Sequence, residues 1–367
     1  MNWPDVAELK DITVGPLVGA SSKGNLVVAA NPPSAALQHF RYGSGESALA
    51  VIPFPAPVVP NAIIDEPVIY GGLLFRHFGH ALTESIHRLW PRYARRELHG
   101  AKVAFNLVNN TKIMPYITEA LNFHGFSKSD IIPITEPILF RRLFVGRQAR
   151  TLAGPTVIAS YRTMLDRDLS RRLPPPAPEN KIYVSRSRHR HTGTYYGETH
   201  IETELAKVGF EIVFPEDHSL TALVTMLRNA SIAIFAEGSA IHALELCGSN
   251  VPATAVIARR PHAIPRFAPL LTDICERWTI SDRLRKTAGM ALDGKKHSGV
   301  LDLAAVGDDV REFAHLPGSF MAEPGALMAA IERDLERHIL EARNDNLPDY
   351  MARAEHLREV VRLWAPH

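Results

Sequence analysis

The sequence predicts an α/β protein with two domains. Short apolar segments alternate with helical segments along most of the chain, which indicates sheets flanked by helices. The length of 367 residues is typical of two domains rather than one. A stiff, proline-rich stretch, LPPPAPEN at residues 173–180, predicts the linker between them. We therefore expect a first domain over 1–172 and a second over 181–320, followed by helices over 321–367 that pack back across the domains.

Composition and charge argue against several classes of protein. With 46% hydrophobic and 22% charged residues, the chain has the make-up of a globular protein. Its net charge of +2 argues against binding through bulk charge, so we expect no nucleic-acid partner. Cys247 and Cys275 are the only cysteines and form no CxxC pair. This argues against a disulfide framework and a cysteine-ligated zinc site, and fits a reducing compartment.

The first residues do not predict an export signal, and no segment predicts a membrane span. The first residues, MNWPDVAELKD, carry acidic side chains and no apolar stretch, so they do not resemble a signal peptide. No window approaches the roughly 20 apolar residues that span a bilayer. We expect a soluble, cytoplasmic protein, or one attached to a membrane surface.

Apolar runs and their breaks predict the elements of the first domain. Prolines at 53, 55, 57 and 60 limit helix formation, so residues 1–60 are expected to form short strands and loops. Beyond them we expect strands at 67–75, 102–107, 131–134 and 143–145, and helices at about 79–98, 114–124 and 160–172.

The second domain is predicted to be a βαβαβ unit, which is typical of a doubly wound parallel sheet. Ser219 suits the N-cap of one helix, and Gly209 and Gly248 end two others. The expected strands cover 181–185, 211–214, 231–236 and 251–257, and the expected helices cover 200–208, 219–229, 240–247, 324–343 and 349–364.

A strand, turn and helix around Glu237, Gly238 and Ser239 is the strongest candidate for a ligand site. Glycine allows close backbone approach, and the free N–H groups that start a helix attract anions. We expect phosphate contacts at Gly238 and Ser239, His242 within reach of the same anion, and a sugar or ribose hydroxyl on Glu237. The alternative is an ordinary turn in which Ser239 is a plain N-cap.

A second candidate lies just beyond the strand expected at 181–185. Arg186, Arg188 and Arg190 alternate along an extended chain, so they are expected to share one side. Planar guanidinium groups at the carboxyl end of a strand suit recognition of a diphosphate. The alternative is a solvated basic loop.

A third candidate is the helix that contains His80, Glu84 and His87. Their spacing of i, i+4 and i+7 places them on one face, and His77 lies just before the helix. A His–Glu pair can take a proton from a hydroxyl, whereas two histidines and a carboxylate can hold a metal ion. A polar helix face with one core histidine is the third interpretation.

In this order, the segments HFGHALTES, YVSRSRHR, GFEIVFPEDHSL and AEGSAIHALEL resemble glycosyltransferase family 61, which includes bacterial capsular polysaccharide biosynthesis proteins. The resemblance covers about Tyr70 to Gly248. It implies the GT-B fold, with two Rossmann-like domains and an interdomain cleft. It also implies a nucleotide-sugar donor, inversion at the anomeric centre, and no metal requirement.

The resemblance also assigns residues. The family's His-x-x-x-acid helix matches His80 and Glu84, and its Arg-x-Arg-x-Arg strand end matches Arg186, Arg188 and Arg190. An Asn-Glu pair usually follows those arginines, whereas this chain has Tyr196-Gly197-Glu198 after a longer spacer. Many members have His-Gly where this chain has Glu237-Gly238.

The resulting hypothesis is an inverting, metal-independent hexosyl- or pentosyltransferase of polysaccharide biosynthesis that needs no cofactor. It would transfer a sugar from a nucleotide sugar to a glycan hydroxyl, in the cytoplasm or peripherally at the inner membrane face. Glu84 is favoured as the base with His80 orienting it, the reverse assignment stays open, and His77 and His87 lie on the acceptor side. Donor, acceptor and oligomeric state are not predicted. Two alternatives remain, a metal-dependent hydrolase built on His77, His80, Glu84 and His87, and a non-catalytic sugar-nucleotide-binding protein.

Overall fold

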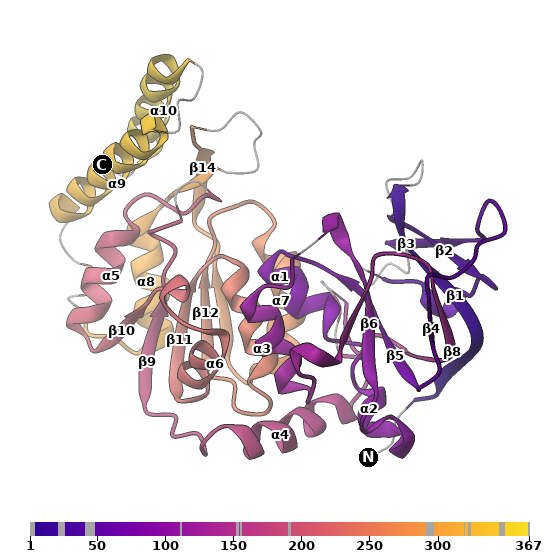
Figure 1. Cartoon of the computed structure of the whole chain (residues 1–367). Helices are drawn as coiled ribbons and strands as arrows, with labels where there is room; N and C mark the ends of the chain where they lie inside the picture. The colour runs from indigo at the N-terminus through magenta and orange to yellow at the C-terminus, as the bar shows by residue number, and fades with distance from the viewer. Residues whose placement is uncertain are drawn as a thin grey trace. The chain divides into compact units, whose positions relative to one another are not determined.

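The computed structural model describes residues 4–20, 26–40, 48–110, 112–151, 154, 156–189, 192–290, 297–318, 320–321, 324–344 and 349–365. Contacts divide the chain into two compact units. Unit 1 consists of Met1–Pro175 and His242–Ser249, and unit 2 consists of Pro176–Ile241 and Asn250–His367. Each unit has its own sheet and helices, which confirms the predicted α/β class (Figure 1).

Unit 1 contains a mixed sheet. Its strands follow the order β3-β2-β1-β8-β5-β6-β7, with β4 paired to β8. β5, β6 and β7 are parallel neighbours, whereas β1 is antiparallel to both β2 and β8. The strands are β1 (Val6–Ala20), β2 (Leu26–Asn31), β3 (Leu49–Ile52), β4 (Ala62–Ile64), β5 (Val68–Leu74), β6 (Lys102–Leu107), β7 (Ile131–Ile134) and β8 (Ile138–Gly146).

The first strand corrects one prediction. Residues 1–60 were expected to form only short strands, but β1 runs for 15 residues. It pairs with β8 from Val6 opposite Gly146 to Val14 opposite Ile138. Because the partner strand lies far along the chain, local sequence does not reveal how long the pairing continues.

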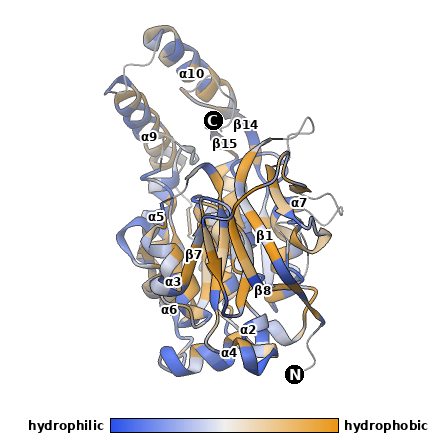
Figure 2. Ribbon diagram, turned by 45° about the vertical axis from the view of Figure 1, so that its right-hand side comes forward, coloured by the Kyte–Doolittle hydropathy of each residue, from blue (hydrophilic) through white to orange (hydrophobic). Residues whose placement is uncertain are grey.

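The core of unit 1 lies around β5. All seven of its residues are buried, as expected for a strand that is covered on both faces. Apolar side chains also concentrate on β8, which pairs with β5, and on β1, which pairs with β8 (Figure 2). A Cβ on Gly71 would overlap the ring of Phe105, so glycine lets this ring of β6 lie against β5.

The helix predicted at about 79–98 does not form as one helix. It is divided into α1 (Phe78–His80), a π-helical turn (Ala81–Ser85), α2 (Pro91–Ala94) and a 3₁₀ turn (Arg96–Leu98). Several side chains in this stretch bond to backbone outside it; for example, Ser85 Oγ donates to Leu73 O and Trp90 Nε1 donates to Arg147 O. Pro91 has no N–H to continue a helix. The remaining helices of unit 1 are α3 (Pro115–Phe123) and α4 (Ser160–Arg172).

Unit 2 contains a parallel five-stranded sheet. The strands follow the order β10-β9-β11-β12-β13, so the direction of winding reverses between β9 and β11. They are β9 (Asn180–Val184), β10 (Phe210–Val213), β11 (Ala230–Ala236), β12 (Ala253–Ile257) and β13 (Trp278–Ser281). The accompanying helices are α5 (Glu198–Lys207), α6 (Leu220–Arg228), α7 (Ala263–Ile274) and α8 (Leu303–Ala314). The predicted doubly wound βαβαβ pattern is therefore present, and Ser219 Oγ accepts from Ala222 N as the expected N-cap.

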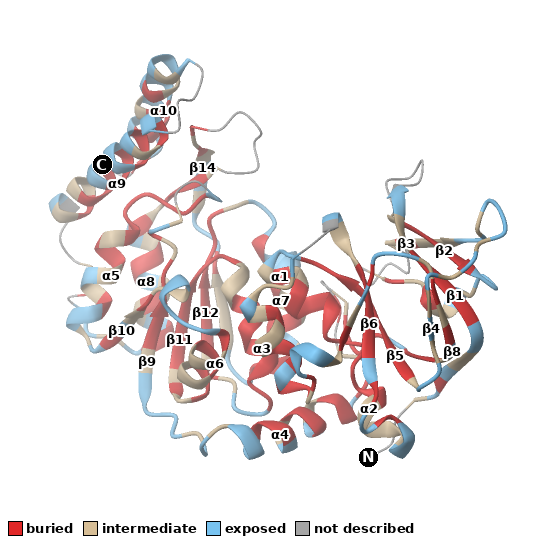
Figure 3. Ribbon diagram, in the orientation of Figure 1, coloured by how far each residue is buried: buried red, intermediate tan, exposed pale blue. Residues whose placement is uncertain are grey.

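The last two helices belong to unit 2. They are α9 (Pro324–Asn344) and α10 (Tyr350–Trp364), and a hairpin of β14 (Leu284–Ala288) and β15 (Ser298–Leu301) lies against α10. Asp334 accepts from the N–H of Gly197, and His338 bonds to Tyr196, which holds α9 beside the start of α5. The outward faces of α9 and α10 are exposed (Figure 3). Within the described ranges, no helix is both long enough and apolar enough to cross a bilayer.

Candidate functional site

Three parallel strands of unit 2 end at chemically distinctive residues. Arg186 follows β9, Glu237 and Gly238 follow β11, and Arg259 and Arg260 follow β12. Because these strands are parallel neighbours, the residues gather at one edge of the sheet. The strand order reverses between β9 and β11, which is where doubly wound sheets bind ligands.

Arg186 lies directly against Gly238. A Cβ at Gly238 would lie 2.5 Å from Arg186 Nη1 and 2.7 Å from its Cδ, so only glycine leaves space for this side chain. The guanidinium is held by backbone rather than by an acid, since Nε and Nη2 both donate to Gly193 O at 3.2 Å. Nη2 also donates to Thr192 Oγ1 at 3.0 Å. Among the side chains that the structure describes, the positive charge of Arg186 thus has no direct carboxylate partner.

Glu237 supports the two other arginines. Its side chain is completely buried, and Oε2 accepts from the N–H groups of Arg259 and Arg260 at 2.9 and 3.1 Å. Oε1 accepts from both Nε and Nη2 of Arg260, at 2.9 and 2.6 Å, so a single carboxylate oxygen binds two donors of the guanidinium. The sequence suggested a sugar or ribose hydroxyl for Glu237, but in the structure its oxygens contact these two arginines.

The three arginines together form a concentrated positive charge. Arg259 is 3% exposed, and its side chain donates to the backbone oxygens of Glu237 and His297. Burial, together with the charges of Arg260 and Arg186, lowers the pKa of Arg259 to about 9. Burial also lowers the pKa of Arg186. Cations that repel one another in this way are poised to gain an anionic ligand.

Glu198 anchors the backbone next to Arg186. It is buried, and Oε1 accepts from Arg186 N at 2.7 Å, from Tyr183 Oη at 3.0 Å and from Ser185 Oγ at 3.2 Å. Burial raises its pKa to about 7, although the hydrogen bond from Arg186 N acts in the opposite direction. The Glu198 side chain therefore holds the backbone of the turn that follows β9.

The alternating arrangement of Arg186, Arg188 and Arg190 is wrong for Arg188. Residues after Val184 turn rather than continue as a strand, so alternation does not apply. Arg188 is about half exposed, pairs with Asp217 at 2.6 Å and lies 3.6 Å over the ring of Phe214. Arg190 lies outside the described residues.

The segment after Gly238 also differs from its prediction. An α-helix was expected at 240–247, whereas a 3₁₀ helix covers Ser239–Leu246. Ser239 is half-buried at its start. His242 is 6% exposed and lies in unit 1, where its Nδ1 is 3.5 Å from Glu245 Oε1.

In unit 1 the structure brings His80 and Glu84 together. His80 Nδ1 lies 2.5 Å from Glu84 Oε1, and His39 Nε2 lies 3.3 Å from Glu84 Oε2. The π-helical turn that carries Glu84 follows α1 directly, so His80 sits one turn before its partner. Such turns often occur at functional sites. The Glu84 carboxylate therefore lies between the imidazole rings of His80 and His39.

The different exposure of their side chains indicates different roles for His80 and Glu84. The side chains of Glu84 and His39 are fully buried, whereas the side chain of His80 is 30% exposed. His77 lies beside it, with ring centroids 5.1 Å apart in an edge arrangement. His80 is therefore the member of the pair that a bound molecule can reach, and Glu84 is placed to hold its ring.

His87 has a different partner from His80. It is 1% exposed, and its Nε2 lies 2.8 Å from Glu245 Oε2. Arg150 Nε is 3.6 Å from the same oxygen. Burial acts to raise the pKa of Glu245, but hydrogen bonds from His242 and His87 and the charge of Arg150 lower it to about 2. Because the expected long helix is broken, His87 does not form one polar face with His80 and Glu84.

Comparison with known proteins supports one family. The sequence model described as Glycosyltransferase 61 matches residues 78–256. This match, which covers just under half of the chain, supports a glycosyltransferase family 61 protein. The comparison with curated proteins found no match. Membership of the family supports glycosyltransferase activity as the general function.

The match to glycosyltransferase family 61 includes both candidate groups of residues. It begins at Phe78, and so contains the His80–Glu84 pair, and it extends through Arg186, Glu237 and Gly238. It ends at Val256, three residues before Arg259. Arg259 and Arg260 therefore enter the site through the tertiary structure rather than through the family match.

Sequence reasoning missed four residues of these two groups. Arg259 and Arg260 follow a strand that was predicted, so the signal that singled out Arg186 was available for them too. His39 and Glu245 carried no such signal, because their partners Glu84 and His87 are distant in sequence. Among the side chains that the structure describes, no group of three or more His, Cys, Asp and Glu residues is arranged to hold a metal ion.

Proposed function

We propose that this family 61 protein is an inverting glycosyltransferase that uses a nucleotide-sugar donor and needs no metal ion. The observation that supports this most strongly is the group Arg186, Arg259 and Arg260 at the strand-order reversal of the unit 2 sheet. In a doubly wound sheet this is the position at which nucleotide ligands bind. We further propose that the two units act together as the two halves of a GT-B enzyme.

The arginines suit the diphosphate of the donor. As the bond between the anomeric carbon and the phosphate oxygen breaks, its electron pair moves onto that oxygen, and the diphosphate gains negative charge. Fixed cations that are already in place stabilise this charge without reorganisation. Arg186 and Arg259 are held mainly by backbone oxygens, so they can meet an incoming anion. Their charge is also a reason for a divalent metal to be dispensable.

We propose His80 as the base, with Glu84 as its positioning residue. The acceptor hydroxyl would lose its proton to His80 Nε2 as its oxygen forms a bond to the anomeric carbon. Glu84, at 2.5 Å from Nδ1, would accept from Nδ1–H and so hold the tautomer that leaves Nε2 free to take the proton. This reverses the assignment that the sequence favoured, because Glu84 is fully buried and His80 is not.

The remaining features of the proposal come from the family resemblance. They are transfer of a hexosyl or pentosyl group to a glycan hydroxyl, a role in polysaccharide biosynthesis such as capsule formation, and action in the cytoplasm, with peripheral attachment at the inner membrane face as an option. No cofactor beyond the donor is proposed.

The test is turnover of a panel of nucleotide sugars, with and without a chelator. We expect at least one donor to be hydrolysed or transferred with inversion, and the chelator to leave the rate unchanged. Arg186→Met should weaken nucleotide binding, and His80→Ala should strongly lower turnover while nucleotide binding persists. Nucleotide binding without turnover of any donor would favour a non-catalytic binding protein, and loss of activity with chelator would overturn the metal-independent mechanism.

A further inference from the structure

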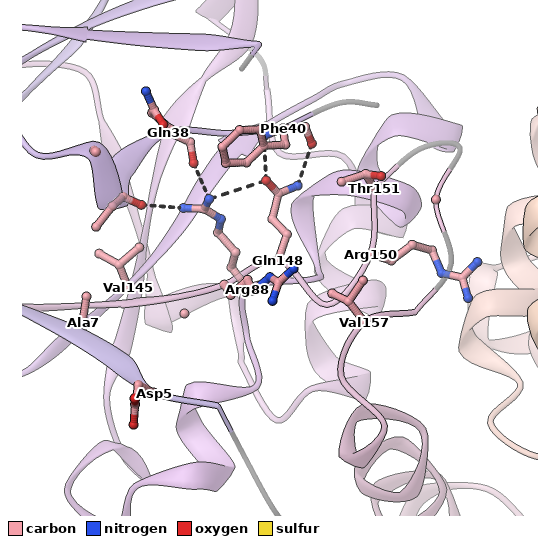
Figure 4. Close-up of a pocket in the computed structure, with 15 residues that line it drawn as sticks. Asp5, Ala7, Gln38, Phe40, Arg88, Val145, Gln148, Arg150, Thr151 and Val157 are labelled. Atoms are coloured by element: carbon pink, nitrogen blue, oxygen red, sulfur yellow. Dashed lines mark hydrogen bonds between the residues drawn. The ribbon is translucent and has the colours of Figure 1, made fainter. Parts of the chain in front are cut away.

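Unit 1 contains a cavity that the proposed transfer reaction does not use. Its volume is about 620 Å³, and most of its lining is apolar, including Ala7, Phe40, Val145 and Val157 (Figure 4). The cavity also reaches Arg88, whose side chain is 2% exposed. A volume of this size accommodates a small organic molecule.

The partners of Arg88 among the described residues are all uncharged. Nη1 donates to Ala36 O at 3.3 Å, and Nη2 donates to Gln38 O and, at 3.5 Å, to Gln148 Oε1 (Figure 4). Gln148 is itself fixed by two hydrogen bonds with the backbone of Phe40. The surroundings of Arg88 are therefore rigid, and its guanidinium is positioned rather than loosely packed.

The charge of Arg88 has no partner among the residues that the structure describes. In the part of the chain that the structure describes, Arg88 forms no ion pair, and its Nε has no hydrogen-bond acceptor. Burial lowers its pKa to about 10, and the largest opposing effect comes from Tyr70 rather than from a carboxylate. Buried cations are normally paired, because leaving them unpaired is strongly unfavourable.

The other charged groups of the lining do not neutralise Arg88. Arg150 is directed to the Glu245 carboxylate, which offsets its charge, whereas Arg147 is exposed at the cavity and adds to the positive potential. Asp5 is the acidic side chain of the lining and is itself exposed to solvent. The cavity thus combines an apolar wall with an excess of positive charge.

We propose that this cavity binds an oxyanion, either a carboxylate or a phosphate monoester, carried by a largely apolar molecule. Arg88 is its counter-ion, and the apolar wall receives the remainder of the ligand. The site involves only residues of unit 1 and does not depend on glycosyl transfer. If Arg88 only held the segment around Gln38 in place, its removal would lower the stability of the fold, and the wild-type protein would bind no anion in this cavity.

Calorimetric titration of the full-length protein tests this with four probes below their micellar concentrations. Octyl phosphate and octanoate represent the two possible sources of the oxyanion, inorganic phosphate lacks the apolar body, and octyl glucoside lacks the charge. We expect one of the two anionic octyl compounds to bind at least tenfold more tightly than inorganic phosphate and octyl glucoside. The tighter of the two identifies the source of the anion.

Three variants make the result specific. Arg88→Met should weaken binding of the anionic probe at least tenfold, whereas Arg96→Met, at an exposed site outside the cavity, should leave it unchanged. Val157→Trp should obstruct the cavity from its half-exposed wall without touching Arg88, and decides the matter if Arg88→Met does not fold. Binding that is equal for all four probes, or that survives Val157→Trp, would overturn the proposal.

Discussion

Arg186 packs so closely against Gly238 that a larger residue at position 238 would overlap it, because a Cβ there would lie 2.5 Å from Arg186 Nη1. Two strands that are separated by a helix, a strand and a second helix deliver these residues to the same place. The relationship explains why the turn after β11 contains glycine, and it makes the position of the arginine dependent on that glycine.

Gly238→Ala should therefore displace Arg186 and weaken nucleotide binding about tenfold or more, the loss expected for one charge-assisted contact. Binding is measured by titration calorimetry with nucleoside diphosphates. Gly325→Ala is the matched control, because a Cβ there meets nothing within 4 Å. Unchanged affinity in Gly238→Ala would separate Arg186 from the donor site.

Arg186 and Arg188 should respond differently to the same substitution. Arg186→Met removes a cation at the strand-order reversal, so nucleotide affinity should fall about tenfold or more. Arg188→Met removes an exposed residue that pairs with Asp217, so affinity should change less than about twofold. Equal losses in the two variants would contradict the site described here.

The His80–Glu84 pair should behave as a base and its support. His80→Ala should lower kcat by about two to four orders of magnitude, the range of general base catalysis, with little change in nucleotide affinity. Glu84→Gln should also lower kcat, and should alter the acidic limb of the pH–rate profile, because it removes the acceptor of Nδ1–H. A Glu84→Gln enzyme with wild-type kcat and pH profile would exclude the positioning role.

Glu198 should make stability depend on pH. Its pKa is raised by burial to about 7 from an ordinary value of 4.5, so the folded chain binds more protons than the unfolded chain between these values. The stability that protonated Glu198 contributes is fully present below about pH 4.5 and is lost as pH rises through 7. Melting temperatures measured from pH 4.5 to 8 should therefore fall less steeply in Glu198→Gln than in wild type. Glu211→Gln, at an exposed strand position, should retain the wild-type slope.

Glu245 should be important for the stability of the fold. It is buried between His87, His242 and Arg150, and removing one member of a buried charged group costs about 3–5 kcal/mol. Glu245→Leu should lower the free energy of unfolding by roughly this amount in urea titrations. Glu336→Leu breaks only an exposed pair with Arg358 and should cost about 0–1 kcal/mol. Similar midpoints for the two variants would show that the buried group contributes no more than a surface pair.

Local sequence was sufficient to predict those strands and helices whose apolar period and caps lie within the element itself. The strands and helices of the βαβαβ unit were predicted close to their observed ends, and so were α3, α4 and the two C-terminal helices. In these segments the apolar period and the caps act within a few residues of each other. The prediction of one long helix after His77 was wrong for the opposite reason. Side chains in this stretch bond to distant backbone, and the helix is interrupted.

The sequence by itself determined the α/β class, the pairing of His80 with Glu84 and the special position of Gly238, since each depends on neighbours in the chain. Only the tertiary structure decided that Arg259 and Arg260 join Arg186, that Arg188 turns away, and that Glu84 is buried while His80 is exposed. Parallel strands bring distant residues to one sheet edge, and burial depends on everything packed around a side chain. Neither the meeting of distant residues at a sheet edge nor the burial of a side chain can be read from a short window of sequence.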